Sequence, residues 1–417
     1  MMIFYFTDPI LRAPVLGSLF MCLAASLMGS LAFLKKRSLL GEAISHAAYP
    51  GVVLGSLCAA LLGLEPFFLS LLGALICSLG GLLFLEWLEK KAKVKSDAAL
   101  CYLLSSFFGL GILAVSYLQA KFPLFANQAQ LYLYGQAATM TDIHIVLYVA
   151  LSAAVILFLL AGSRVLQAVL FDGQYSRFSQ IGSRILSAAQ FTLFLLSIII
   201  GIRSVGVILM SGMLIAPAVA ARAYTDRFGL FLFLSGLFGA FSGLFGAILS
   251  VERSLPTGPV IVCVGALLAI CSLLFAPKRG VVARCFRILL FRWRCIEENI
   301  LKLVWKKDAI QRSVLKETQK TWFLFFLILN MKWQGWVVLK KGIVSLTADG
   351  SRKAARIVRL HRLWETYLAD LGWPLEKVHR TAEEMEHILT PEFEERLARA
   401  LQNPKVDPHA QPIPERI

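Results

Sequence analysis

The chain has 417 residues, of which 58 % are hydrophobic and 16 % are charged, with a formal net charge of +16. This composition excludes a disordered tail, a coiled coil and a secreted disulfide scaffold, and it indicates an integral membrane protein. The charge is unevenly distributed: residues 1–277 contain 16 Lys and Arg and 10 Asp and Glu, whereas residues 278–417 contain 26 and 16. We therefore predict a membrane domain over 1–277, followed by a part of different character.

Apolar segments in the first part are long enough to cross a bilayer, which takes about 20 predominantly apolar residues. They predict nine transmembrane helices, near residues 15–34, 43–63, 66–87, 98–118, 143–161, 186–202, 204–222, 229–250 and 258–276. Lys and Arg concentrate in cytoplasmic loops, and the loops after odd-numbered spans hold twelve of them against four on the opposite side. This asymmetry predicts an outside N-terminus and a cytoplasmic location for everything after Pro277.

Two ionisable residues begin the second predicted span. Glu42 and His46 are four residues apart, so on a helix they share one face and present an oxygen and a nitrogen donor to the same point. Pro50 and Gly51 follow one turn later, where a missing backbone hydrogen bond predicts a hinge, and Pro217 is a second candidate hinge. A metal path beside a hinge is one interpretation, and a solvated, salt-bridged helix end is the other.

The stretch LGEAISHAAYPGVVLG, residues 40–55, resembles the signature of the ABC-3 family of metal-ion ABC transporter permeases. Stretches 204–222, 255–262 and 273–280 agree with the same family in order. The resemblance implies an all-α permease in the bacterial cytoplasmic membrane that imports manganese, zinc or ferrous iron, with Glu42 and His46 contacting the ion. It also implies a partner ATPase, a periplasmic or extracellular metal-binding protein and a second permease subunit, identical or related.

The nucleotide is expected on that partner, because the chain contains no G-x-x-x-x-G-K-[ST] motif that would cradle phosphates. We therefore predict a transport subunit that is not an enzyme. The segment FDGQYSRFSQIG, residues 171–182, is similar to the cytoplasmic stretch of the family that contacts the ATPase, which assigns Phe171, Asp172 and Gly182 to that contact. The alternative is that residues 171–182 form a polar loop that makes no such contact.

The second part begins with residues 278–296, where arginines alternate with Phe and Trp. This pattern predicts a basic amphipathic linker that attracts anionic lipid headgroups or nucleic acid. In residues 297–346, the short apolar run 322–329 predicts the buried core of a small soluble domain, and alternation around Lys341 and Gly342 predicts a hairpin. Together they suggest a winged-helix DNA-binding region, with Lys316, Lys320, Lys340 and Lys341 as candidate DNA contacts.

Four of the six histidines lie in the last 57 residues. Helical spacing places His379, Glu383, Glu386 and His387 on one face, and His361 and Glu365 form another pair spaced by four. Oxygen and nitrogen donors without thiolate favour Mn²⁺ or Fe²⁺ over structural zinc. The alternative is a solvated acidic face that pairs with nearby arginines.

Residues 344–414 resemble the metal-binding and dimerisation domain of the diphtheria-toxin-repressor and manganese-regulator family. The resemblance implies a primary metal site at Glu383, Glu386 and His387 and an ancillary site at His361, Glu365 and His379, with the metal as co-repressor. Glu383 matches the manganese-type members at that position. We expect a metal permease with a cytoplasmic repressor-like tail, in which residues 347–417 form the metal-binding and dimerisation domain. The tail is expected to bind operator DNA through residues 297–346, with or without release by cleavage. Alternatively, the tail regulates transport without binding DNA.

Overall fold

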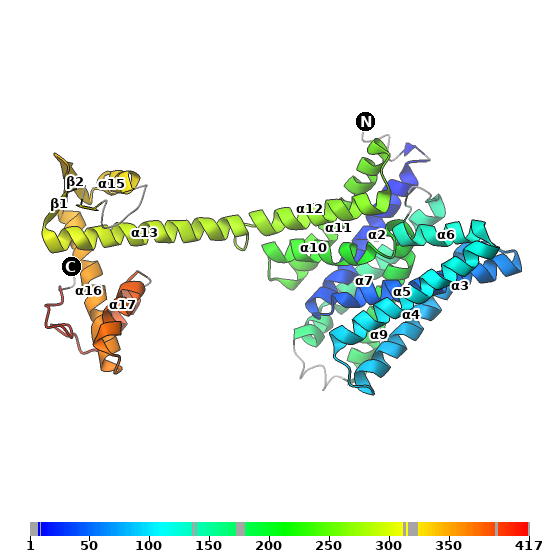
Figure 1. The fold of residues 1–417 in the computed structure, drawn as a ribbon, viewed down its shortest axis with the longest axis horizontal. Helices are drawn as coiled ribbons and strands as arrows, with labels where there is room; N and C mark the ends of the chain where they lie inside the picture. The colour runs from blue at the N-terminus through cyan, green and yellow to red at the C-terminus, as the bar shows by residue number, and fades with distance from the viewer. Residues whose placement is uncertain are drawn as a thin grey trace. The chain divides into compact units, whose positions relative to one another are not determined.

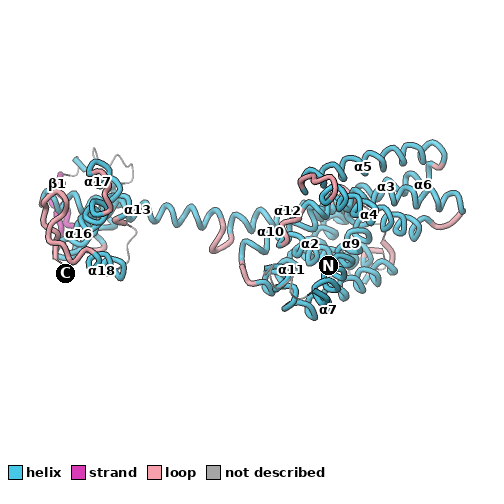
Figure 2. Tube along the Cα trace, turned by 90° about the horizontal axis from the view of Figure 1, so that it is seen from below, coloured by secondary structure: helices cyan, strands magenta, loops and turns pink. Residues whose placement is uncertain are grey.

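A computed structural model describes residues 7–8, 10–135, 137, 140–171, 180–311, 314–315, 324–387 and 391–415. Contacts divide the chain into two compact units, Met1–Arg284 and Cys285–Ile417 (Figure 1). Among the described residues, the first unit is helical and the strands lie in the second unit (Figure 2). Each unit is described by itself below.

Among the described residues of the first unit, eight helices are long and apolar enough to cross a membrane. They are α2 (Arg12–Leu34), α3 (Leu39–Leu62), α4 (Pro66–Lys90), α5 (Ser96–Lys121), α7 (Asp142–Phe171), the Ile185–Val205 part of α9 (Gln180–Val205), α11 (Phe228–Arg253) and α12 (Thr257–Phe275). The same part of the chain also contains two shorter helices, α6 (Pro123–Tyr134) and α10 (Met210–Tyr224). The multi-pass membrane class predicted from composition therefore agrees with the fold.

The structure differs from the nine predicted spans at the seventh. Segment 204–222 forms a turn at Gly206, whose φ is +96°, followed by the 15-residue α10. Fifteen residues rise about 22 Å, less than the roughly 30 Å of bilayer hydrocarbon. The turn is fixed because the backbone N–H of Val207 donates to Tyr132 O at 2.9 Å, at the end of α6. Hydropathy could not reveal this turn, since the residues around it are as apolar as those of a span.

Small residues allow the helices of this unit to approach closely. A Cβ added to Gly51 of α3 would lie 2.1 Å from the carbonyl oxygen of Gly73 on α4. Between α2 and α11, the hydroxyls of Ser30 and Ser235 are 2.6 Å apart. Such contacts are typical of helix packing in membranes, where dispersion and polar contacts replace the hydrophobic effect. They place α2 and α3 in the interior of the unit, with most of their residues buried.

A helix forms where a linker was predicted, and the second unit begins within this helix. Helix α13 runs without a break over Val281–Lys307, so it includes most of 278–296 and the start of the predicted winged-helix region. Strands β1 (Ala309–Gln311), β2 (Val337–Lys340) and β3 (Ile343–Leu346) form an antiparallel sheet in the order β1-β3-β2. The predicted hairpin is confirmed: Lys341 and Gly342 connect β2 to β3 with φ values of +47° and +78°, which suits a tight two-residue turn.

The apolar run 322–329 was predicted to be buried, and this prediction is only half right. Helix α15 (Leu324–Trp333) buries Leu324, Leu327, Ile328 and Met331 in the core beneath the sheet. Phe325, Phe326 and Leu329, on the other face, are each more than half exposed. Length and hydropathy do not distinguish a helix that is apolar on one face from one that is apolar all round.

Three further helices form the last part of the chain, α16 (Ala348–Asp370), α17 (Leu375–Met385) and α18 (Pro391–Ala400). Thr347 caps α16, because its hydroxyl accepts the backbone N–H of Gly350 at 3.0 Å. A second apolar core includes Leu363, Leu368 and Val378, and it packs α16 against α17. This packing brings the histidines and carboxylates of the two helices together.

Candidate metal sites

Three donor residues converge between α16 and α17. His361 and Glu365 lie on successive turns of α16, and His379 faces them from α17. His361 Nε2 lies 3.1 Å from both Glu365 Oε1 and His379 Nδ1, and His379 Nδ1 lies 2.7 Å from Glu365 Oε1. In the part of the chain that the structure describes, these three form the group whose donor atoms could share one metal ion. They are the residues that the sequence assigned to the ancillary site.

The same contacts shift the protonation of the cluster. Burial lowers the pKa of His361, but hydrogen bonds to the carboxylates of Glu365 and Glu386 outweigh it, so the pKa is raised. Burial raises the pKa of Glu365, but hydrogen bonds with His361 and His379 outweigh it and lower the pKa to about 2. The two carboxylates therefore favour the protonated imidazole of His361, and a metal ion that bound here would compete with that proton.

The residues assigned to the primary site do not converge in the same way. Glu386 directs one oxygen to His361 Nδ1, while His387 Nε2 lies 3.8 Å from the other, Glu386 Oε1. Glu383 is exposed. The ammonium group of Lys302 lies between these carboxylates. Its Nζ is 2.8 and 3.1 Å from the two oxygens of Glu386 and 3.9 Å from Glu383 Oε1.

Sequence reasoning missed the contribution of α13 to this region. Glu298 accepts a hydrogen bond from His387 Nδ1 at 2.7 Å, and Lys302 pairs with Glu386. The available signal was the spacing of four that places Glu298 and Lys302 on one face of α13. That signal is weak, because the partners lie 84 to 89 residues away in the chain.

The donor chemistry fits a divalent metal in the tail. Two imidazoles and a carboxylate supply nitrogen and oxygen ligands from two helices, and His361 and Glu365 are buried beneath the partly exposed His379. Imidazole and carboxylate together suit Mn²⁺, Fe²⁺ and Zn²⁺. Glu386 and His387 are adjacent oxygen and nitrogen donors, but Lys302 holds Glu386.

In the membrane unit, Glu42 and His46 lie one turn apart near the start of α3. His46 is 7 % exposed, and its Nδ1 has no hydrogen-bond partner in the described structure. Its ring packs edge-on against Phe108 of α5, with the centroids 4.9 Å apart, and Glu42 is partly exposed. A buried polar atom without a partner is costly, so the Nδ1 atom of His46 is a candidate ligand atom.

The predicted hinge residues lie inside continuous helices. Helix α3 passes through Pro50 without a break, and α10 passes through Pro217. Gly51 allows close packing of α3 on α4, because a Cβ at this position would overlap the backbone of Gly73. The hinge role therefore stays a prediction, and Gly51 has a packing role in addition.

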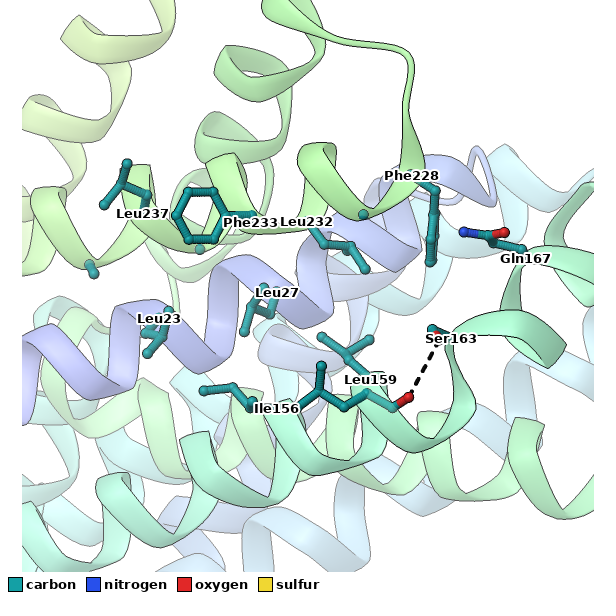
Figure 3. Close-up of a pocket in the computed structure, with 14 residues that line it drawn as sticks. Leu23, Leu27, Ile156, Leu159, Ser163, Gln167, Phe228, Leu232, Phe233 and Leu237 are labelled. Carbon is teal, nitrogen blue, oxygen red and sulfur yellow. Dashed lines mark hydrogen bonds between the residues drawn. The ribbon is translucent and has the colours of Figure 1, made fainter.

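Two cavities in the membrane unit differ in character. One, of about 640 Å³, lies between α2, α7 and α11 and is lined mainly by Leu, Ile and Phe side chains (Figure 3). None of its lining side chains is ionisable, so the cavity offers no charged ligand to a cation. The Ser163 hydroxyl at one end donates a hydrogen bond to Leu160 O. The other, of about 380 Å³, is lined in part by Glu65, His144 and Arg203. His144 Nδ1 accepts the Thr141 N–H there, which leaves Nε2 as a donor unsuited to a cation.

Several predicted contact residues are only partly described. Phe171 ends α7 and is exposed, and Gly182 lies in the first turn of α9, whereas Asp172 lies outside the described residues. Of the four candidate DNA contacts, Lys340 and Lys341 are exposed at the hairpin turn. Lys316 and Lys320 lie outside the described residues.

Comparisons with known proteins agree with the division of the chain into a membrane unit and a tail. Residues 7–276 match the ABC 3 transport family, and residues 347–415 match the iron dependent repressor, metal binding and dimerisation domain. A probable metal transport system membrane protein of Chlamydia trachomatis is 34 % identical over 444 residues, covering 99 % of this chain and 97 % of that protein. The manganese transport system membrane protein MntC of Bacillus subtilis is 32 % identical, covering 84 % of this chain and 82 % of its own length.

A solved structure supports the fold of the membrane unit. PsaBC from Streptococcus pneumoniae in complex with Fab is 26 % identical, with a TM-score of 0.58, and covers 67 % of this chain and 96 % of that one. The match to the repressor family begins at residue 347, so it includes α16 to α18 but not the sheet or α15. The repressor family model thus matches the part of the tail that contains the candidate metal ligands, and it does not extend to the predicted DNA-binding part.

Proposed function

Because the chain belongs to the ABC 3 transport family, it is the permease subunit of a metal ABC import system, and we propose that the ion passes Glu42 and His46 on α3. The observation that carries this proposal is the buried His46 Nδ1 without a partner, one turn from a carboxylate. A nitrogen and an oxygen donor on one helix face offer two ligands to a divalent ion. Protein ligands then replace part of its water as it crosses.

Family membership also defines the machinery. Permeases of this family act with an ATPase and a solute-binding protein, and the permease itself is not catalytic. Our proposal adds an outside N-terminus, a cytoplasmic tail, and a dimer with a second copy or a related permease. ATPase contact at Phe171, Asp172 and Gly182, and bending at Pro50, Gly51 and Pro217, belong to the same proposal.

The ion is Mn²⁺, Fe²⁺ or Zn²⁺, with Mn²⁺ or Fe²⁺ favoured by the oxygen and nitrogen donors and the absence of thiolate among the proposed ligands. The names of relatives do not narrow this choice, since they include manganese, zinc and iron transport proteins. The identity is tested by measuring uptake of the three ions into cells that express the whole system.

The decisive experiment compares uptake by Glu42→Ala and His46→Ala with uptake by Ser45→Ala. Ser45 is a matched control, because it is buried on the same helix and its hydroxyl donates only to Gly41 O of its own helix. We expect the first two substitutions to reduce uptake at least tenfold at equal protein level, and the control to retain it. Wild-type uptake by both ligand variants would exclude this path.

For the tail, the proposed ancillary site is His361, Glu365 and His379, and the proposed primary site is Glu383, Glu386 and His387. A bound metal would supply positive charge that holds α16 to α17 in place of a proton. Calorimetry on the full chain in nanodiscs tests this, with His379→Ala expected to weaken binding and the exposed His409→Ala as the control. Equal affinities for both variants would exclude the ancillary site.

Two outputs of metal binding in the tail are proposed. One is binding of operator DNA, supported by the three-stranded sheet and the exposed Lys340 and Lys341, which can contact phosphates. The other is regulation of transport without DNA. Retention of DNA from upstream of the gene on the metal-loaded chain, with an affinity that falls steeply with salt, would favour the first. Metal-dependent uptake rates without DNA retention would favour the second.

A further inference from the structure

Two helices of the second unit expose apolar faces next to each other. On α13, Phe286, Leu289, Leu290 and Trp293 follow the i, i+3, i+4, i+7 pattern of one helix face. The first three of these side chains are each more than half exposed. On α15, Phe326, Leu329 and Trp333 share the face opposite its buried residues, and Trp333 is 87 % exposed. Helix α15 is thus apolar on its inner and its outer side.

A buried carboxylate joins the two faces into one surface. Glu297 of α13 accepts a hydrogen bond from Trp293 Nε1 at 2.9 Å and another from Asn330 Nδ2 of α15 at 2.6 Å. Trp293 and Trp333 consequently line one open groove, together with Phe326 and Leu329. We name this combined surface, formed by residues 286, 289, 290, 293, 326, 329 and 333, the aromatic face.

Cations lie beside the aromatic face. Arg287 and Arg294 follow Phe286 and Trp293 directly, which places both on one flank of this face of α13, and Lys332 precedes Trp333 on α15. All three are exposed. A continuous exposed apolar surface marks an interaction site, and apolar and aromatic side chains with Lys and Arg beside them are the composition of helices that lie in a membrane interface.

We propose that the aromatic face of the tail docks on an anionic lipid bilayer, with Trp333, Phe326, Leu289 and Phe286 in the interface and the flanking cations on the headgroups. The connection to the membrane supports this occupant. Only five residues separate the end of the last candidate span, Phe275, from the start of α13, Val281, so α13 is tethered to the membrane unit by a short connection. Attachment raises the effective concentration of the bilayer and removes most of the entropic cost of docking.

The same chemistry argues against two other occupants. Base edges are read by hydrogen-bonding side chains, and the outer face of α15 presents rings and a leucine instead. Anionic headgroups attract each of the cations beside the apolar surface, which favours a lipid bilayer over an uncharged protein surface as the occupant. The proposal does not depend on Glu42, His46 or a metal in the tail, so it can fail or hold separately from the proposed function.

Photolabelling tests the docking on the full chain. The protein is reconstituted in nanodiscs that contain phosphatidylglycerol and a trace of a phospholipid with a diazirine on its acyl chain, and labelled peptides are mapped by mass spectrometry. We expect label in residues 285–295 and 324–333. Nanodiscs of phosphatidylcholine, or high salt, should reduce this label severalfold, because both weaken the attraction of the cations.

Trp333→Ser should reduce the labelling of the α15 peptide about tenfold, as expected for the loss of one large buried aromatic side chain. The matched control is Trp373→Ser, because Trp373 is also an exposed tryptophan of the tail but lies outside the aromatic face. Labelling of 324–333 at the level of the Trp373 peptide would overturn the proposal. So would label that is indifferent to Trp333→Ser, or a crosslink of α15 to a second tail in place of lipid.

Discussion

Lys302 provides the sharpest test of how the tail is held together without metal. Its ammonium lies 2.8 and 3.1 Å from the oxygens of Glu386, and the side chains are 9 % and 0 % exposed. Replacing one member of a buried ion pair leaves an uncompensated charge, which costs about 3–5 kcal/mol. Because His361 still bonds Glu386, we expect Lys302→Met to cost about 3 kcal/mol, the lower end of that range.

Hydrogen exchange on the full chain in nanodiscs measures this cost as the opening free energy of residues 375–387. The matched control is Lys306→Met, which removes an exposed lysine one turn later on the same helix and should cost no more than about 0.5 kcal/mol. Combining Lys302→Met with Glu386→Gln should recover much of the loss, since neither charge remains. Equal costs for Lys302→Met and Lys306→Met would refute the argument.

The metal affinity of Lys302→Met provides a second test. If a divalent ion binds Glu386, Lys302 competes with it, so Lys302→Met should bind the ion more tightly than wild type. At about 100 times its dissociation constant a ligand contributes about 2.7 kcal/mol, enough to offset most of the loss. Calorimetric affinities that are equal for wild type and Lys302→Met would show that Glu386 does not bind the ion.

Three other outcomes follow from individual contacts. Gly51→Ala should lower membrane-unit stability in a thermal-shift assay by about 1–3 kcal/mol, because its Cβ would overlap Gly73 O. The metal-free tail should be most stable between pH 4.5 and 6.5, as measured by hydrogen exchange. The raised pKa of His361 contributes stability that is lost as the pH rises through that pKa. The lowered pKa of Glu365 contributes stability that is lost as the pH falls toward 2. Thr347→Ala should lower the opening free energy at the start of α16 by about 1 kcal/mol, measured by hydrogen exchange, because the helix loses its cap.

Much of the architecture was predictable because its causes are local. Continuous apolar runs gave eight helices of spanning length, and alternation around Lys341 and Gly342 gave the hairpin. The seventh span was predicted but is replaced by a turn and a shorter helix. The sequence did not reveal the turn at Gly206 because it lies within an apolar stretch. The outer face of α15 was missed for a related reason: hydropathy counts apolar residues without showing which of them the sheet covers.

For the sites, the sequence by itself determined the donor pairs that lie on one helix, Glu42 with His46 and His361 with Glu365, because a spacing of four fixes their shared face. Only the tertiary structure decided which pairs gain further partners. His379 joins His361 from 18 residues away, and Lys302 meets Glu386 across 84 residues. Those contacts depend on how α13, α16 and α17 pack around their apolar cores, and helical periodicity carries no information about which faces of separate helices meet.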